Sequence, residues 1–435
     1  MKLRVLPGGK LSGTCSVPGD KSISHRAAMI ASIAEGATEI YNYSTGADCR
    51  QTLQCLEKLG VEIEETKQRL RIVGRGLAGL QEPEQILDAG NSGTTMRLLL
   101  GLLAGQDLFA VLTGDQSLCQ RPMGRVITPL AMMGAQIRGR SGDYAPLAIR
   151  GFSEVRPIEY RLPVASAQVK SAILLAGLQA SGTTSIIQPL PSRDHTERML
   201  QVFGAPLRVD GNVISLQGKK KLGGQIIRVP GDISAAAYLI VAAAIVPGSS
   251  IFIRDVGINL TRTGILDVLE IMGAEIELEN MCLWNKEPMA DLLVRSADLK
   301  GTVIAGELLP LVLDEIPVLA VAATAAQGET IISDASELRV KETDRLQAIT
   351  SELRKMNAEI KEKPDGLIIR GGPLEGARVN SWGDHRIAMA LAVAGLIAKG
   401  ETIIEDAGCI DISFPDFTKQ LNLLGNFNRC SKLVR

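Results

Sequence analysis

One pattern recurs six times in this 435-residue chain, about every 70 residues, and it constrains the fold more than any other feature. Each copy has a loop of small and polar residues, a helix rich in Ala, Leu and Ile, a β-type run and a second, amphipathic helix. Such a unit cannot bury its apolar face alone, so neighbouring copies must stack. The copies start near Asp20, Asn91, Ser166, Asp232, Asp314 and Asp384.

The two helices of a copy differ in their apolar pattern. The first is apolar nearly all round, as in residues 171–180 and 235–245, which predicts a helix buried inside its domain. The second has apolar residues at the 3.6-residue period with charges between them, as in residues 346–356, which predicts a half-exposed helix. The copies end with LGV at Leu59, MGA at Met133, FGA at Phe203, MGA at Met272, MNA at Met356 and LGN at Leu424.

The Gly in these endings stands where a helix is commonly followed by a residue in the left-handed conformation. The runs that come next, residues 62–65, 136–139 and 275–278, are typical of edge strands. Alternating helices and strands predict an α/β fold with the apolar helices inside and the strands outside. Six copies divide most simply into two groups of three, so we expect two similar domains.

Two similar loops indicate where the chain passes between these domains. The loop that contains Pro18 and Gly19 resembles the loop that contains Pro230 and Gly231, and each stands immediately before a copy begins. We therefore expect domain I to comprise residues 1–18 and 230–435, and domain II to comprise residues 19–229.

The composition excludes several classes of partner. Lys and Arg total 47 against 48 Asp and Glu, so no overall field attracts nucleic acid or an anionic membrane. Aromatic residues are only 3%, too few for the stacking surface of a single-strand binder, and the core should be aliphatic. Seven Cys, an odd number without a C-x-x-C pair, indicate neither a disulfide framework nor a zinc ribbon. The start lacks the apolar stretch of a signal peptide. We expect a soluble, cytoplasmic monomer.

The loops before the apolar helices carry clustered cations. Asp20-Lys21-Ser22-Ile23-Ser24-His25-Arg26 places two cations and two hydroxyls at a helix start, where free N–H groups already favour anions. A simpler interpretation is that Ser22 is an N-cap and the cations are solvated. No G-x-x-x-x-G-K motif is present, so ATP use is not indicated. Similar cationic or small-residue loops are 91–97, 120–125, 166–170 and 191–195.

The second half supplies candidate acids and bases. Asp314 precedes a nearly wholly apolar helix, and residues 338–345 (LRVKETDR) contain five charges, among them Lys341 and Glu342. A charge run is usually a solvated face, but this one lies where other copies carry their anion-binding loops. Asp314 and Asp384 could also be simple N-caps. The three His, at 25, 195 and 385, lack ligand spacing, so no metal site is expected.

These loops together indicate a site for a multiply anionic ligand between the domains. The strongly cationic residues come from both halves of the chain and are Lys21, Arg26, Arg121, Arg193, Lys341, Arg345 and Arg386.

Nine ordered motifs make the chain resemble the 5-enolpyruvylshikimate-3-phosphate synthase family over nearly its whole length. They are VPGDKSISHRA, DAGNSGTTMR, RPMGRV, SAQVKSA, SRDHTE, VPGDIS, LDEIPVLAVAA, ELRVKETDR and GDHRIAMA. The resemblance implies two domains, each of three βαβαββ repeats with buried helices and outer sheets, an inside-out α/β barrel. It also implies transfer of the enolpyruvyl group of phosphoenolpyruvate to the 5-hydroxyl of shikimate 3-phosphate, with no metal or organic cofactor and with glyphosate as an inhibitor.

The resemblance also implies roles for individual residues. Asp314 would be the base for the 5-hydroxyl, and Lys21 and Glu342 would transfer protons at the phosphoenolpyruvate methylene. The residues implied for phosphoenolpyruvate are Lys21, Gly93, Arg121, Gln168, Arg345 and Arg386. The residues implied for shikimate 3-phosphate are Lys21, Ser22, Arg26, Ser166, Ala167, Gln168, Arg193, Asp314 and Lys341.

The chain departs from the family pattern in two places. Many members have a Lys shortly before the last Phe-Pro, where this chain has Cys409 to Ser413, and the helix after Gly93 continues Arg97-Leu98 rather than Arg-Pro. Two other functions remain open. A UDP-N-acetylglucosamine enolpyruvyl transferase uses a loop Cys several residues before Arg-Pro, whereas Cys119 is only two residues before Arg121. A non-catalytic, hinged anion-binding protein would not need Asp314 or Glu342.

Overall fold

The chain folds into two compact units in the computed structural model, which describes residues 1–66, 68–425 and 430–433. Unit 1 comprises Met1–Pro18, Pro230–Leu283 and Pro288–Arg435, and unit 2 comprises Gly19–Val229 and Trp284–Glu287. Each unit has its own hydrophobic core. The cores are aliphatic, as expected: the core of unit 2 contains Phe203 as its only fully buried aromatic side chain among the described residues.

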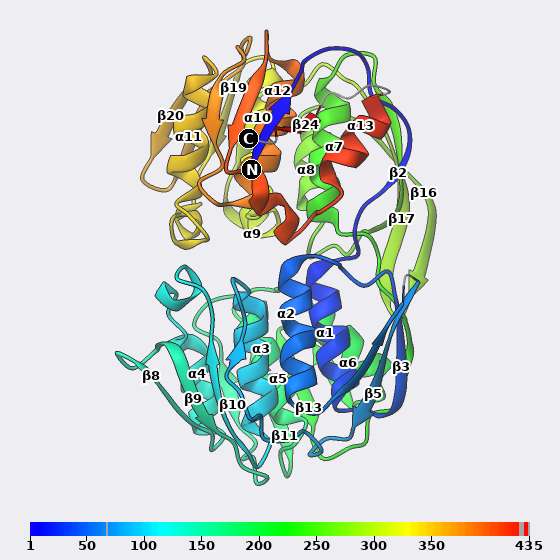
Figure 1. The fold of residues 1–435 in the computed structure, drawn as a ribbon, viewed down its shortest axis with the longest axis vertical. Helices are drawn as coiled ribbons and strands as arrows, with labels where there is room; N and C mark the ends of the chain where they lie inside the picture. The colour runs from blue at the N-terminus through cyan, green and yellow to red at the C-terminus, as the bar shows by residue number, and fades with distance from the viewer. Residues whose placement is uncertain (67, 426–429, 434–435) are drawn as a thin grey trace. The chain divides into compact units, whose positions relative to one another are not determined.

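The strands of the described residues form six four-stranded mixed sheets, three in each unit (Figure 1). In every sheet, a parallel pair at one edge is followed by an antiparallel pair. The sheets of unit 2 are, in spatial order, β14 (Ile226–Arg228), β3 (Glu35–Tyr41), β5 (Arg69–Arg75), β4 (Glu62–Glu65); β6 (Leu87–Asp88), β7 (Phe109–Thr113), β9 (Tyr144–Arg150), β8 (Gln136–Arg140); and β10 (Glu159–Arg161), β11 (Thr183–Ile187), β13 (Val213–Gln217), β12 (Leu207–Asp210).

Unit 1 has the same arrangement of three sheets. Its first and last strands, β1 and β24, pair with each other, so both ends of the described chain lie in one sheet. The sheets are β16 (Glu275–Trp284), β17 (Glu287–Arg295), β15 (Ser250–Gly257), β2 (Ser12–Ser16); β18 (Val303–Ile304), β19 (Glu329–Ile332), β21 (Gly366–Arg370), β20 (Glu359–Lys363); and β22 (Arg378–Asn380), β23 (Thr402–Glu405), β1 (Lys2–Val5), β24 (Cys430–Leu433). The three predicted edge strands β4, β8 and β16 all lie at sheet edges, which confirms that prediction.

Six helices correspond to the apolar runs of the sequence, and nearly all of their residues are buried. Five of them begin at a side-chain N-cap that accepts from a backbone N–H: Asp20, Ser92, Ser166, Asp232 and Asp384. The predicted starts are thus correct to within one residue. The helices are α1 (Lys21–Ser32), α3 (Gly93–Ala104), α5 (Ala167–Gly177), α7 (Ile233–Ile245), α10 (Ile316–Ala325) and α12 (His385–Ile397).

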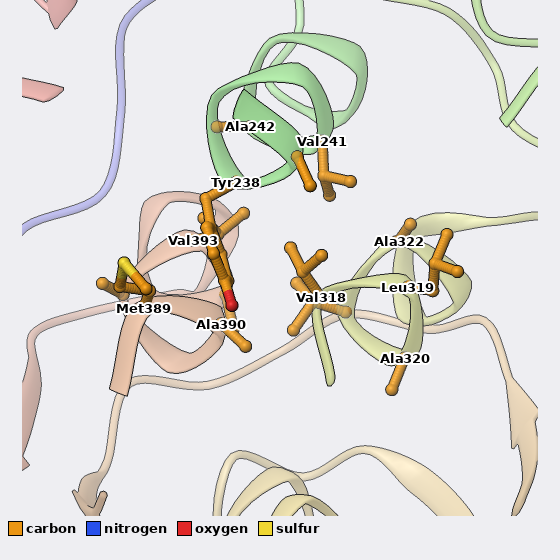
Figure 2. Close-up of a cluster of buried hydrophobic side chains, with 14 of the residues drawn as sticks. Tyr238, Val241, Ala242, Val318, Leu319, Ala320, Ala322, Met389, Ala390 and Val393 are labelled. Carbon is orange, nitrogen blue, oxygen red and sulfur yellow. The ribbon is translucent and has the colours of Figure 1, made fainter. Parts of the chain in front are cut away.

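The core of unit 1 shows why these helices carry small residues (Figure 2). Helices α7, α10 and α12 contact one another, and Tyr238, Val318 and Val393 from the three helices lie in the space between them. Ala242, Ala322 and Ala390, one from each helix, are fully buried in this core. Burying a Val or Leu side chain contributes roughly 1.5–3 kcal/mol, so a helix apolar on every side is stable only when it is covered on every side.

The second helices end as the sequence predicts in five copies. The residue after each C-cap has a left-handed φ: +82° at Gly60, +112° at Gly134, +92° at Gly204, +89° at Gly273 and +66° at Asn357. In the sixth copy Gly425 is the last helical residue, and the residues after it lie outside the described part. These helices are α2 (Ala47–Lys58), α4 (Gly124–Met132), α6 (His195–Val202), α8 (Gly264–Ile271), α11 (Arg345–Lys355) and α13 (Phe417–Gly425).

Shorter elements connect these parts. The one-turn helix α9 (Leu309–Val312) leads into α10, and the 3₁₀ helices are η1 (Leu118–Gln120), η2 (Gly306–Leu308), η3 (Ser336–Val340) and η4 (Ala407–Ile412). Within the described residues, no single helix is long and apolar enough to cross a membrane. The segments 306–312 and 316–325 meet that requirement only as a pair, and the pair is bent by 110°. All seven Cys are free thiols.

We expect Gly204→Ala to destabilise unit 2 through the backbone alone. A Cβ at Gly204 would meet no atom within 4 Å, but φ is +92° there, where an L side chain costs roughly 1–2 kcal/mol. The midpoint of urea unfolding should fall. Gly223→Ala is the matched control, because its Cβ would meet only a Gln225 side-chain atom at 3.9 Å and its φ is not in the left-handed region. Equal midpoints for the two variants would contradict this account.

Candidate active site

Arg345 is the centre of a cluster of charges in unit 1. It is the first residue of α11, it is 1% exposed, and its guanidinium meets three carboxylates. Nε donates to Asp384 Oδ2 at 2.8 Å, Nη2 donates to Glu342 Oε2 at 2.6 Å, and Nη1 lies 3.4 Å from Asp314 Oδ1. Burial alone would lower the pKa of Arg345, but Asp384 and Glu342 outweigh it and raise the pKa, so the guanidinium stays charged.

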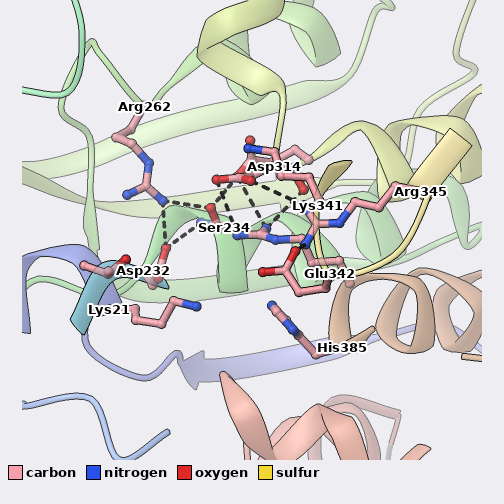
Figure 3. Close-up of polar contacts among 12 residues, drawn as sticks. Lys21, Asp232, Ser234, Arg262, Asp314, Lys341, Glu342, Arg345 and His385 are labelled. Carbon is pink, nitrogen blue, oxygen red and sulfur yellow. Dashed lines mark hydrogen bonds and ion pairs between the residues drawn. The ribbon is translucent and has the colours of Figure 1, made fainter. Parts of the chain in front are cut away.

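Arg386 joins this cluster from the first turn of α12. Its Nη1 donates to the backbone carbonyl of Asp314 at 3.1 Å, and its Nη2 lies 3.6 Å from Asp314 Oδ2. Burial would lower the pKa of Arg386, and the charge of Asp314 overcomes this and raises it. The structure therefore brings four of the expected residues together, namely Asp314, Glu342, Arg345 and Arg386, as Figure 3 shows in part.

Lys341 pairs with a carboxylate outside the Arg345 cluster, unlike its neighbour Glu342, which pairs with Arg345. Its Nζ donates to Glu337 Oε1 at 2.7 Å, one turn back in the chain, and both side chains are partly exposed. An exposed pair of this kind contributes only about 0–1 kcal/mol, so Lys341 can exchange Glu337 for another anion at little cost. The solvated-face interpretation therefore describes Lys341 but not Glu342 and Arg345.

Lys21 has a carboxylate partner in unit 2. It is the first residue of α1, and its Nζ donates to Asp48 Oδ2 at 2.9 Å, with side chains that are 20% and 10% exposed. Asp48 lies in the first turn of α2. Asp20 caps the same helix by accepting from the Ile23 N–H at 2.9 Å. Asp20 rather than Ser22 is therefore the N-cap, and the alternative interpretation of Ser22 is wrong.

The start of α3 gathers three of the residues expected around phosphoenolpyruvate, namely Gly93, Arg121 and Gln168. Arg97 Nη1 donates to Gln168 Oε1 at 2.8 Å, and Gln168 Nε2 donates to Thr94 Oγ1 at 3.0 Å. A Cβ at Gly93 would lie 2.7 Å from Arg97 Nη1 and 3.6 Å from Arg121 Nη1. The missing side chain of Gly93 is thus what lets the Arg97 guanidinium approach the turn, whereas Arg121 would be in ordinary contact with such a Cβ.

Arg121 and Arg26 are held by protein groups in unit 2. Arg121 Nη2 donates to Asn91 Oδ1 and Ser117 Oγ, both at 3.1 Å. Arg26 donates to Thr196 Oγ1 at 2.6 Å, to Ser171 Oγ at 2.8 Å and to the carbonyl of Ser22 at 2.9 Å. These bonds fix both guanidinium groups in place.

Burial lowers the pKa of Arg26 to about 10, and the positive charge of Arg193 acts in the same direction. Arg193 is therefore close enough to Arg26 for their charges to interact.

Ser166 is the N-cap of α5, and Ala167 is its first residue, so the expected hydroxyl at residue 166 also has a structural role. The Ser166 Oγ accepts from the Val169 N–H at 3.4 Å.

A chain of buried hydroxyls links the three helices that carry these groups. His25 Nδ1 and Thr52 Oγ1 are 2.7 Å apart, and Thr52 Oγ1 and Thr95 Oγ1 are also 2.7 Å apart. Thr95 Oγ1 donates to Ser92 Oγ, the N-cap of α3, at 2.7 Å. Burial lowers the pKa of His25 to about 3, so the imidazole is neutral at ordinary pH.

Several members of these clusters were not expected from the sequence. Asp48 gave no signal, because only the packing of α2 against α1 brings it to Lys21. Asp384 was expected at most as an N-cap, and it caps α12 through the Arg386 N–H while also binding Arg345. Ser234, Arg262 and Glu315 form a further polar chain in unit 1. Figure 3 labels the first two of these residues.

The departure from the expected pattern at Cys409 has a clear structural consequence. Cys409 lies in η4 and donates to the Asp406 carbonyl at 3.4 Å, and burial raises its pKa to about 11. It is therefore a neutral thiol and cannot supply the charge of a Lys.

The Cys119 thiol donates to the Gly114 carbonyl at 3.3 Å. No group of three or more His, Cys, Asp and Glu side chains in the described chain could hold a metal ion.

Six small mixed sheets and apolar helices, with arginines and carboxylates gathered at the helix starts, define an α/β protein that binds small anions. Residues 5–421 match the family model described as EPSP synthase (3-phosphoshikimate 1-carboxyvinyltransferase). The chain belongs to this family.

Individual relatives agree along the whole chain. The 3-phosphoshikimate 1-carboxyvinyltransferase of Brevibacillus brevis is 54% identical over 417 residues, covering 95% of this chain and 98% of the relative. The protein of the same name from Thermoanaerobacter sp. (strain X514) is 55% identical over 415 residues, with the same coverage. A solved structure of EPSP synthase from Acinetobacter baumannii has 44% identity and a TM-score of 0.90, and covers 99% of this chain and 100% of its own.

We predict that His25 makes the protein less stable as the pH falls. Its pKa is about 3 in the folded state and about 6.5 when unfolded, so between these values only the unfolded chain binds the proton. This contribution to stability is complete above pH 6.5 and is lost as the pH falls toward 3, by up to about 1.4 kcal/mol per pH unit.

Urea unfolding between pH 4 and 8 measures this dependence. His25→Gln keeps a polar partner for Thr52 but cannot titrate, so its midpoint should fall less steeply than that of the wild type as the pH is lowered. Parallel curves for the two proteins would show that His25 is already protonated in the folded state.

Proposed function

We propose that this chain transfers the enolpyruvyl group of phosphoenolpyruvate to the 5-hydroxyl of shikimate 3-phosphate, with release of phosphate. It uses two clusters of polar side chains, one around Arg345 in unit 1 and one at the starts of α1, α3 and α5 in unit 2. The chain is a transferase of the shikimate pathway, which leads through chorismate to the aromatic amino acids. The observation that carries the mechanism is the contact of Arg345 with Asp314 and Glu342. In this proposal Asp314 and Glu342 hold the buried arginine and also transfer protons, and a site that only bound anions would need no proton transfer.

The ligand assignments follow the charges of the two substrates. Phosphoenolpyruvate has a phosphate and a carboxylate, and its ligands are the cations Lys21, Arg121, Arg345 and Arg386. Gln168 is a hydrogen-bond partner, and Gly93 leaves space for the substrate because it has no side chain. Planar guanidinium groups suit both anionic groups of phosphoenolpyruvate. The residues that take shikimate 3-phosphate are Lys21, Ser22, Arg26, Ser166, Ala167, Gln168, Arg193, Asp314 and Lys341.

The chemistry needs one acid and one base on the same two carbons. Protonation of the methylene carbon makes C2 of phosphoenolpyruvate electrophilic, and the 5-oxygen adds to it while Asp314 takes the hydroxyl proton. This gives a tetrahedral intermediate, which loses a methyl proton and phosphate to restore the enol ether. Glu342 and Lys21 move the protons at the methylene carbon, and the arginines stabilise the negative charge.

The fold supports the same proposal. We take the six sheets as six copies of one βαβαββ repeat, three in each domain, around buried helices. We take the two domains as residues 1–18 with 230–435, and residues 19–229. The protein acts as a cytoplasmic monomer and needs no metal or organic cofactor for this reaction.

The alternative sugar-nucleotide substrate finds less support. That reaction class uses a loop Cys, and the Cys119 thiol here donates to a backbone carbonyl of its own loop. Two relatives that are more than half identical to this chain, over 98% of their own length, are named 3-phosphoshikimate 1-carboxyvinyltransferase. A turnover assay that measures phosphate release with each of the two acceptor substrates tests the choice directly.

We expect Glu342→Gln to lose turnover by roughly 10²-fold or more, because it removes one proton-transfer group but keeps side-chain size and hydrogen bonding. The KM values for both substrates should change little. Phosphate release with shikimate 3-phosphate and phosphoenolpyruvate is the measurement.

Cys119→Ala is the control for this variant, and it should keep near-full activity because its thiol has no chemical role in the proposal. An active Glu342→Gln with an inactive Cys119→Ala would reverse both the catalytic assignment and the choice of substrate.

We expect Gly93→Ala to weaken inhibition by glyphosate, which competes with phosphoenolpyruvate in this family. The new methyl group would lie 2.7 Å from Arg97 Nη1, so the guanidinium must shift and the open side of the turn is lost. The bulkier inhibitor should suffer more than the substrate. Inhibition constants and the KM for phosphoenolpyruvate give the comparison, and equal losses for both ligands would place Gly93 away from them.

A further inference from the structure

Three buried residues of unit 1, Ser234, Arg262 and Glu315, and the partly buried Asp232 form a polar chain that leads to Arg386 and that no substrate assignment uses. Asp232 and Ser234 stand at the start of α7, Arg262 stands just before α8, and Glu315 immediately precedes α10. Arg262 Nη2 lies 3.1 Å from Asp232 Oδ1 and donates to Ser234 Oγ at 2.7 Å. Ser234 Oγ in turn donates to Glu315 Oε1.

The direction of these hydrogen bonds is fixed by their donors. A guanidinium can only donate, so the Ser234 hydroxyl accepts from Arg262 and has its single hydrogen left for Glu315. Asp232 holds the other side of this arrangement, because its Oδ1 accepts from both Arg262 and the Ser234 N–H, the latter at 2.9 Å. Each group in the chain therefore has one orientation that satisfies its neighbours.

The charges along the chain also alternate. Arg386 Nη1 lies 4.0 Å from Glu315 Oε1, and Arg386 Nη2 lies 3.6 Å from Asp314 Oδ2, so Arg386 has a carboxylate at each of its terminal nitrogens. Glu315 is 1% exposed and Arg262 is 4% exposed. Buried charges of this kind need partners with good geometry, and Arg262 supplies the second cation that Glu315 reaches through Ser234.

We propose that Arg262 and Ser234 are positioning residues, which hold the Glu315 carboxylate in place and through it the guanidinium of Arg386. This rests on the proposed function, in which Arg386 binds phosphoenolpyruvate. Glu315 turned toward Ser234 can meet only one edge of Arg386, so the guanidinium keeps its remaining N–H groups in one fixed direction for the anionic substrate. If the hydroxyl is removed, Glu315 is released toward Arg386 and competes with the substrate for it.

Steady-state kinetics of full-length variants test this role. In Ser234→Ala we expect the KM for phosphoenolpyruvate to rise about 10-fold while kcat stays within about 3-fold, because a contact made equally in ground and transition states is weakened. The KM for shikimate 3-phosphate should stay unchanged. Ser234→Thr keeps the hydroxyl and should restore the KM for phosphoenolpyruvate.

Arg262→Lys keeps the charge but cannot span Asp232 and Ser234, so it should raise the same KM. If the two residues act as one unit, the double variant Ser234→Ala/Arg262→Lys should have a KM for phosphoenolpyruvate no higher than that of the more strongly affected single variant. Independent effects would instead multiply and raise this KM about 100-fold above that of the wild type. Arg262→Lys also serves where Ser234→Ala fails to fold, since it retains both the hydroxyl and the charge.

Ser249→Ala is the matched control, because Ser249 is a buried serine of the same unit whose Oγ accepts from the Leu11 N–H. It should lower the unfolding midpoint without changing either KM. The inference is overturned if Ser234→Ala alters stability alone, as Ser249→Ala does, or if Ser234→Thr does not restore the KM. Absence of turnover in the wild type would instead overturn the proposed function.

Discussion

The constraint on which this structure depends is that a helix apolar on every face must be covered on every face. All of α7 is buried, from Ile233 to Ile245, and so are nearly all residues of α12. Such helices leave only their ends for polar chemistry, because a charged side chain in the middle would lie in an aliphatic core. The N-terminal end is the better place for anions, since its first backbone N–H groups have no partner within the helix.

This constraint explains why the same residue often both caps a helix and holds a charged neighbour. Asp384 accepts from the Arg386 N–H with one oxygen and from Arg345 Nε with the other, so the cap of α12 also orients the first arginine of α11. Asp232 caps α7 and binds Arg262 with the same oxygen. Each cap thus links the backbone geometry of its helix to the direction of an arginine, and a shift of the helix would shift the charge.

Much of the fold follows from local sequence patterns, whereas much of the site does not. The helix starts, the left-handed residues after the second helices and the edge strands β4, β8 and β16 were all predictable, because each depends on a residue and its immediate neighbours. Asp48 and Arg262 were not predictable, since their roles depend on which helices pack together. The sequence of residues near Asp48 is that of an ordinary amphipathic helix, and only its packing against α1 brings the carboxylate to Lys21.

The permanent charges in the two clusters limit which groups can move protons. Asp384 and Glu342 raise the pKa of Arg345, Asp314 raises that of Arg386, and Arg26 keeps a pKa of about 10 despite its burial. All three guanidinium groups are therefore protonated at any pH at which the protein works, and none can act as an acid or base. His25 is neutral and buried, and Cys409 is a protonated thiol. The proposed mechanism therefore assigns proton transfer to the carboxylates and to Lys21, and it leaves the arginines to bind the substrates, so replacing one carboxylate should lower turnover more than substrate binding.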